Sequence, residues 1–176
     1  MQIRFHDPAS DFSDGLAVIR AYHDSLLTQG RRLLELVSEI ESHGIDPERA
    51  NRLAELYAYY QRANVLHHQD EERALFPAVV GRDLLVDGMI ERLGLDHEEI
   101  EEAWRVLEID LKTMLAHHTL SPDFREKAAR FEKLQREHLT RENEDFLPKV
   151  ESSLQMSQRR VMGKAMATIR GINHNQ

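Results

Sequence analysis

Two pairs of side chains that can bind metal ions occur in the same local context along the chain. His67 is followed four residues later by Glu71, and His138 is followed four residues later by Glu142. In both cases a proline comes six residues after the glutamate. Residues four apart on a helix share one face, with side chains roughly 5–6 Å from each other. Each pair can therefore reach one ion, or two adjacent ions.

Two further histidines precede these pairs at similar distances. His23 comes before His67, and His97 comes before His138, so the chain repeats one unit twice. Glu101 lies four residues after His97 and completes a third pair. We expect these side chains to lie on the apolar faces of four helices and, at 1.5 Å per residue, to meet at one level of the fold.

Carboxylates on an apolar face need a compensating charge, because burying an unpaired carboxylate costs several kcal/mol. Four imidazoles and three carboxylates are too many for one ion, so the pattern predicts two cations. The candidate metal ligands are His23, His67, Glu71, His97, Glu101, His138 and Glu142. They leave part of the coordination of two six-coordinate ions free, so that a small ligand could bind.

Two neighbouring residues offer a weaker version of the same pattern. His68 and Glu72 repeat the four-residue spacing one position further along the chain. Successive side chains on a helix point about 100° apart, so this pair would face inward only if the helix were rotated. Asp70 is expected at the surface beside the site.

The donor set limits which metal can bind. The chain has no cysteine, which excludes thiolate ligands and disulfides. Imidazole with carboxylate suits iron, manganese or zinc. The Glu-x-x-His pairs of ferritin-like di-iron bundles and the His-Glu-x-x-His motif of zinc proteases are both absent from the sequence.

Apolar residues recur at helical spacing almost throughout, so we predict an all-α fold. Short connections favour an up-down-up-down four-helix bundle. We predict a single domain over residues 1–176, with an arm over 1–14, the bundle over 15–150 and a tail helix within 151–176. The predicted helices span 16–41, 47–76, 87–117, 122–147 and 157–169.

Proline marks several predicted helix boundaries. Asp46-Pro47 and Ser121-Pro122 read as an N-cap followed by proline in the first helical turn. Pro77 and Pro148 are expected to end the helices that precede them.

Composition excludes several partners. The 23 Lys and Arg against 31 Asp and Glu give a net charge of −8, so there is no basic surface field for nucleic acid. No apolar run approaches the roughly 20 residues of a membrane span. We therefore predict neither nucleic acid nor membrane as a partner, and a cytoplasmic location.

The chain resembles the hemerythrin-like HHE cation-binding proteins. The resemblance rests on AYHDSLL, LHHQDEERALFP, LDHEEIEEAW and REHLTRENEDFLP, in that order over residues 15–150. It implies a non-heme di-iron site bridged by Glu71 and Glu142, with histidines capping each iron. The oxygen-carrying members have a second histidine on the third helix where this chain has Glu101. That difference argues against reversible oxygen carriage and favours the branches linked to iron sensing, nitric oxide handling or repair of iron–sulfur sites.

Three functions remain open at this point. The first is a di-iron protein that binds or senses O2, NO or peroxide. The second is a di-iron enzyme of nitric oxide or peroxide detoxification, or of iron–sulfur cluster repair, which would need a redox partner protein. The third is a metal-free interaction bundle. The oligomeric state is not predicted.

Overall fold

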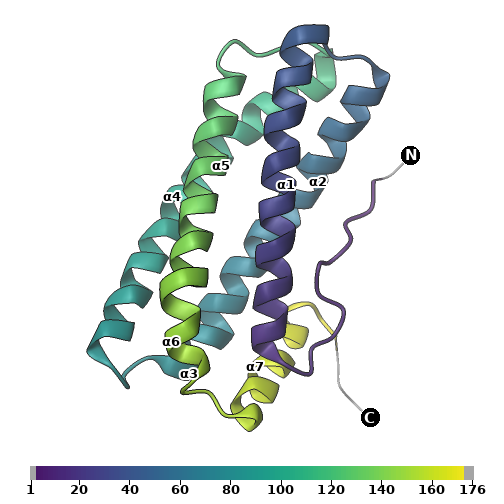
Figure 1. Cartoon of the computed structure of the whole chain (residues 1–176). Coiled ribbons are helices and arrows are strands. Elements are labelled where there is room, and N and C mark those ends of the chain that lie inside the picture. The colour runs from purple at the N-terminus through teal and green to yellow at the C-terminus, as the bar shows by residue number, and fades with distance from the viewer. Residues whose placement is uncertain (1–2, 173–176) are drawn as a thin grey trace.

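The structure, a computed structural model, describes residues 3–172. All of its regular secondary structure is helical, with no strand within that range, which confirms the predicted all-α class. Figure 1 shows long helices beside one another and shorter helical segments at one end. The elements are α1 (Gly15–His43), α2 (Pro47–Asp70), a π-helical turn η1 (Glu71–Leu75), α3 (Phe76–Val79), α4 (Leu84–His117), α5 (Phe124–Arg141), a second π-helical turn η2 (Glu142–Phe146), α6 (Leu147–Glu151) and α7 (Met156–Ile169).

The four long helices contact one another in a ring. α1 packs against α2 and α5, and α4 packs against the same two helices from the other side. Each helix therefore turns one broad face toward a shared interior. This arrangement allows side chains from all four helices to meet.

Aspartate side chains set the starts of three of these helices. Asp14 accepts from the backbone N–H of Leu16, and Asp83 accepts in the same way at the start of α4. Asp46 accepts from the N–H of Arg49, with Pro47 in the first turn, as the sequence predicts. Such caps satisfy backbone donors that a helix start leaves free.

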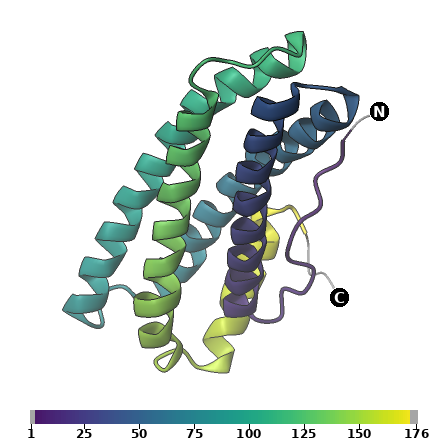
Figure 2. The same ribbon diagram turned by 45° about the horizontal axis from the view of Figure 1, so that its top comes forward.

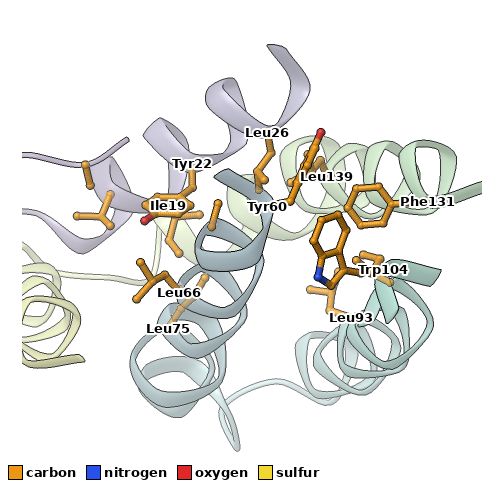
Figure 3. Packing of buried hydrophobic residues seen from close by; sticks show 14 of the residues in the cluster. Ile19, Tyr22, Leu26, Tyr60, Leu66, Leu75, Leu93, Trp104, Phe131 and Leu139 are labelled. Atoms are coloured by element: carbon orange, nitrogen blue, oxygen red, sulfur yellow. The ribbon is translucent and has the colours of Figure 1, made fainter. Parts of the chain in front are cut away.

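One half of the interior is an apolar and aromatic core. Figure 3 shows Tyr60, Trp104 and Phe131 together, with Leu93 and Leu139 beside them. The ring of Tyr60 meets that of Phe131 edge-on at 5.0 Å between centroids. This packing fixes the long helices relative to one another.

Pro77 and Pro148 do not end the helices that precede them, so this prediction is wrong. The helices do not stop at Pro77 and Pro148 but continue as α3 and α6 after one π-helical turn. In these turns the N–H of Phe76 donates to the carbonyl of Glu71, and that of Leu147 to Glu142, five residues back. Proline cannot donate the usual bond four residues back and its ring crowds the preceding turn, and the wider turn accommodates both constraints.

The start of α5 is also later than predicted. Pro122 lies in a turn, and the cap is Asp123, so the helix begins at Phe124. The expectation that Ser121 caps this helix is wrong, because the turn inserts two residues first.

The arm and the tail pack together against the bundle. Figure 2 shows residues 3–14 running along the helices toward the start of α1, with α7 close by. The Tyr22 hydroxyl donates to Asp7, and the Arg170 guanidinium also donates to Asp7. Gly163 of α7 lies so close to Phe12 that an added Cβ would sit 2.0 Å from its carbonyl oxygen. Residues 1–2 and 173–176 of the predicted arm and tail lie outside the described residues.

Within residues 3–172, none of the helices combines the length and the apolar character that a bilayer crossing requires.

Candidate metal centre

Six of the predicted ligands converge inside the bundle. They form two groups of four, each with one atom per residue within 4.8 Å of the others. One group contains His23 and His67, the other contains His97 and His138, and both contain Glu71 and Glu142. All six side chains are at most 2% exposed. The two shared carboxylates thus lie between two pairs of imidazoles.

The two π-helical turns place the glutamates. Glu71 and Glu142 are the first residues of η1 and η2, directly after the α-helices that carry His67 and His138. The His67 Nε2 lies 2.6 Å from a Glu71 oxygen, and His138 stands in the same relation to Glu142. π-Turns within helices are frequent at functional sites. Here they come at matching positions in the two halves of the chain.

The inward-facing atoms of this cluster have no hydrogen-bond partner among the described residues. This holds for the Nε2 atoms of all four histidines and for both oxygens of each glutamate. The short N···O separations between them lack hydrogen-bond geometry. Buried polar atoms are nearly always satisfied, and so many unsatisfied donors and acceptors facing one another form a cradle suited to cations. The residues therefore fit a metal site.

The outer nitrogens of three histidines are held in place. Nδ1 of His97 lies 2.7 Å from a Glu72 oxygen, and Nδ1 of His138 lies 3.1 Å from Asp96. Nδ1 of His23 lies 2.6 Å from the side-chain oxygen of Asn143. A hydrogen bond at Nδ1 leaves the Nε2 lone pair free for a metal and fixes the ring direction.

Charges within the cluster change its protonation. Burial opposes the charged form of three of the histidines, but the nearby glutamates outweigh it and raise the pKa of His23, of His138 and, to about 9, of His97. Burial opposes ionisation of Glu71 in turn, yet His67 and His97 lower its pKa well below the usual range. Without metal, the cluster is thus held together by imidazolium–carboxylate attraction.

The same opposing effects act on the pKa of Glu142. Burial and the neighbouring Glu71 both oppose its ionisation, but His138 and His23 lower the pKa of Glu142 overall. The two carboxylates repel each other, and the positively charged imidazoles beside them offset that repulsion. Metal ions can take over that role from the protons.

Glu101 is not part of either group. Its side chain is 53% exposed, and it accepts a hydrogen bond from Nδ1 of His68 at 3.0 Å. The structure therefore places Glu101 beside His68 and outside the two groups of converging side chains. Glu72, the predicted partner of His68, instead contacts His97.

His68 itself is buried, which the sequence reasoning missed. Its ring stacks on that of His97 at 3.9 Å and 11°. Burial lowers the pKa of His68 to about 4, so it is neutral near pH 7. The signal was present in the sequence, since His68 follows His67 directly, but a single helix face does not include both.

A buried ion pair joins the site to the C-terminal tail. Asp70, expected at the surface, is fully buried, and both its oxygens accept from Arg170 at 2.7 Å. The ring of Tyr22 lies parallel to that of His67 at 5.9 Å and packs under the Arg170 guanidinium. The prediction for Asp70 is wrong because α7 covers this end of α2.

Comparison with known proteins agrees with this geometry. Residues 14–150 match the family model described as the Hemerythrin HHE cation binding domain. A Haemophilus influenzae protein described as uncharacterized is 28% identical over 116 residues, which cover 66% of this chain and 67% of that protein. No solved structure matches significantly.

Proposed function

The chain belongs to the hemerythrin HHE cation-binding family, and from this premise we propose that it is a non-heme di-iron protein that binds or senses a small ligand such as O2, NO or peroxide. The observation that carries the proposal is the convergence of four imidazole nitrogens and four carboxylate oxygens, all buried and without hydrogen-bond partners among the described residues.

Each ion would have its own pair of histidines. His23 and His67 would hold one ion, and His97 and His138 the other. Glu71 and Glu142 would be shared, since each belongs to both groups. The up-down-up-down connection predicted from the sequence is part of this proposal, because it brings the starts of two helices to the same end as the finishes of the other two.

Iron fits this donor set best when the family is considered, and zinc and manganese are the alternatives. When bound, an iron pair supplies open coordination positions and one-electron chemistry to a small ligand. The protein's part is to exclude water from the cluster and to hold three of the four imidazoles, those of His23, His97 and His138, through their outer hydrogen bonds. The nearly complete burial of all six side chains serves the first task.

The enzyme alternative differs in what happens after the ligand binds. Turnover of nitric oxide or peroxide, or donation of iron to a damaged cluster, requires electrons from a redox partner. Binding and sensing require only the open position. A cytoplasmic location would suit either function.

Anaerobic titration with ferrous iron tests the proposal. We expect about two irons per wild-type chain and roughly one in His138→Ala. His117→Ala is the matched control, because it removes an exposed imidazole at the far end of α4. A wild-type chain that takes up no iron, or a His138→Ala chain with unchanged iron content, would contradict the proposal.

Mixing the reduced, loaded protein with O2 or NO then separates the two functions. A stable spectroscopic adduct supports binding or sensing. Repeated consumption of the gas with an added electron donor supports the enzyme.

A further inference from the structure

The two groups of converging side chains offer the same inner atoms to a metal. Each group contributes two imidazole Nε2 atoms, and both share the carboxylates of Glu71 and Glu142. The groups differ in what holds their imidazoles from outside. A partner at the outer ring nitrogen fixes the ring and strengthens its lone pair, and loss of such a partner typically weakens metal binding by about 10–100-fold.

Carboxylates hold both imidazoles of the group that contains His97 and His138. Nδ1 of His97 lies 2.7 Å from a Glu72 oxygen, and Nδ1 of His138 lies 3.1 Å from an Asp96 oxygen. The Arg141 guanidinium donates to both oxygens of Asp96, at 3.0 and 2.9 Å, and fixes that carboxylate in turn. With an anionic acceptor at Nδ1, each ring keeps its lone pair on the Nε2 atom that faces the cluster.

The group that contains His23 and His67 lacks such carboxylates. Nδ1 of His23 lies 2.6 Å from the side-chain oxygen of Asn143, which is a neutral acceptor. Both ring nitrogens of His67 are buried and have no hydrogen-bond partner among residues 3–172. Asp70, three residues after His67, gives both of its oxygens to Arg170 instead.

The unpartnered outer nitrogen of His67 opposes metal binding at this ring. When Nε2 of a neutral imidazole binds a metal, its proton lies on Nδ1. For His67 that buried donor has no acceptor within the described part of the chain, which is unfavourable. The Tyr22 ring lies parallel to the His67 ring at 5.9 Å between centroids, but the Tyr22 hydroxyl donates to Asp7 and so does not fill this role.

We propose that the two metal positions are unequal: the position between His97 and His138 fills first and retains its ion, and the position between His23 and His67 is the exchangeable one. This inference rests on the proposed function. The neutral acceptor at His23 and the missing acceptor at His67 together should make the exchangeable position at least about tenfold weaker. A position that gives up its ion readily suits donation of iron to another protein, while the retained ion offsets the charge of the shared glutamates.

Zinc provides a diamagnetic probe of the order in which the two positions fill. Long-range proton–nitrogen NMR of the imidazoles in the wild-type chain is recorded after one and after two equivalents of Zn²⁺, with His23→Gln and His97→Gln used to assign one ring at each position. We expect the Nε2 signal of His97 to reach its coordinated value at one equivalent and that of His23 only at the second. Equal changes of both signals at one equivalent, or an earlier change at His23, would overturn the inference.

Zinc affinity, measured in competition with a chromophoric chelator, gives a second readout. Asn143→Asp puts a carboxylate at His23 and should tighten the weaker binding step by about tenfold. Glu72→Gln removes the carboxylate at His97 and should weaken the stronger step by about tenfold. Gln61→Glu is the matched control for the added charge, because Gln61 is exposed on α2 and takes part in none of these outer hydrogen bonds.

The control decides how a gain in affinity is interpreted. An equal gain in Gln61→Glu would assign the effect to surface charge and refute the role of the outer acceptors, as would an Asn143→Asp chain with both steps unchanged.

Failure of this inference is distinguishable from failure of the proposed function. If the wild-type chain takes up two zinc ions but the first divides evenly between the positions, the inference fails and the proposed function is unaffected. If the wild-type chain binds no metal, both fail.

Discussion

Metal binding to this site should release protons, because the metal-free cluster holds them. The pKa of His97 is raised to about 9, and those of His23 and His138 are raised as well. At pH 7 the His97 imidazole is therefore protonated in the metal-free protein, and His23 and His138 hold a proton more tightly than a free imidazole does. A metal ion binds only the deprotonated ring and must displace the proton.

The raised pKa of His97 sets the size of the pH effect on metal affinity. Between its pKa near 9 and pH 7 lie two pH units, and each unit lowers the apparent metal affinity about tenfold per displaced proton. Because about half of the His97 rings are still protonated at pH 9, His97 alone makes binding about 50-fold weaker at pH 7 than at pH 9. The raised pKa values of His23 and His138 act in the same direction.

The free energy of unfolding of the metal-free protein should fall over the pH range in which the metal affinity rises. Because the folded pKa of His97 lies above the ordinary 6.5, its contribution is fully present below pH 6.5 and is lost as the pH rises to about 9. The contribution is of the order of 3 kcal/mol. Urea denaturation of the metal-free chain should show this decline.

Calorimetric titration with Zn²⁺ at pH 7, in buffers of different ionisation enthalpy, counts the protons. We expect more than one proton per loaded chain. Glu72→Gln, which removes the carboxylate at His97 Nδ1, should lower that number, while the exposed Glu102→Gln should leave it unchanged. Binding without proton release would refute the account of the metal-free cluster.

Two further predictions concern the tail. Arg170→Met leaves the buried Asp70 carboxylate unpaired and should cost roughly 3–5 kcal/mol of unfolding free energy in urea; a loss below about 1 kcal/mol would contradict the buried pair, and adding Asp70→Asn should recover part of it. Gly163→Ala forces its Cβ against the Phe12 carbonyl and should cost about 1–3 kcal/mol, whereas Gly88→Ala, in open space on α4, should be neutral or slightly stabilising; equal melting temperatures for the two variants would argue against the tight packing of α7 on the arm.

The sequence predicts the inner cluster because its spacing repeats. His67 with Glu71 and His138 with Glu142 share a face at four-residue spacing, and the apolar pattern says that this face is inside. Burial then makes their convergence almost unavoidable, since isolated buried carboxylates are costly.

The same reasoning does not give the positions that Glu101 and His68 take in the structure, for a geometric reason. A helix packed between two neighbours buries an arc wider than one stripe, so His68, about 100° from His67, is also inside, on the side toward α4. Glu101 shares a face with His97 but lies at the edge of the buried arc, half exposed beside His68. Helical periodicity predicts which face of a helix is buried, but it does not predict which neighbouring helix covers each edge of that face.

The burial of Asp70 and the two π-helical turns also differ from the sequence prediction, because helical periodicity carries no information on either. Asp70 is buried only because Arg170, a hundred residues later, reaches it from the tail. The π-helical turns that begin at Glu71 and Glu142 each insert one extra residue into the helix. The prolines that follow predict the end of each helix, whereas the wider turn lets the helix continue past them.

A crystal structure of the iron-loaded chain, with anomalous scattering recorded at the iron edge, tests the central claim most directly. The account predicts two anomalous peaks inside the bundle, both contacting Glu71 and Glu142, with one nearer His23 and His67 and the other nearer His97 and His138. A single peak, or peaks confined to the surface with the cluster unchanged, would contradict it.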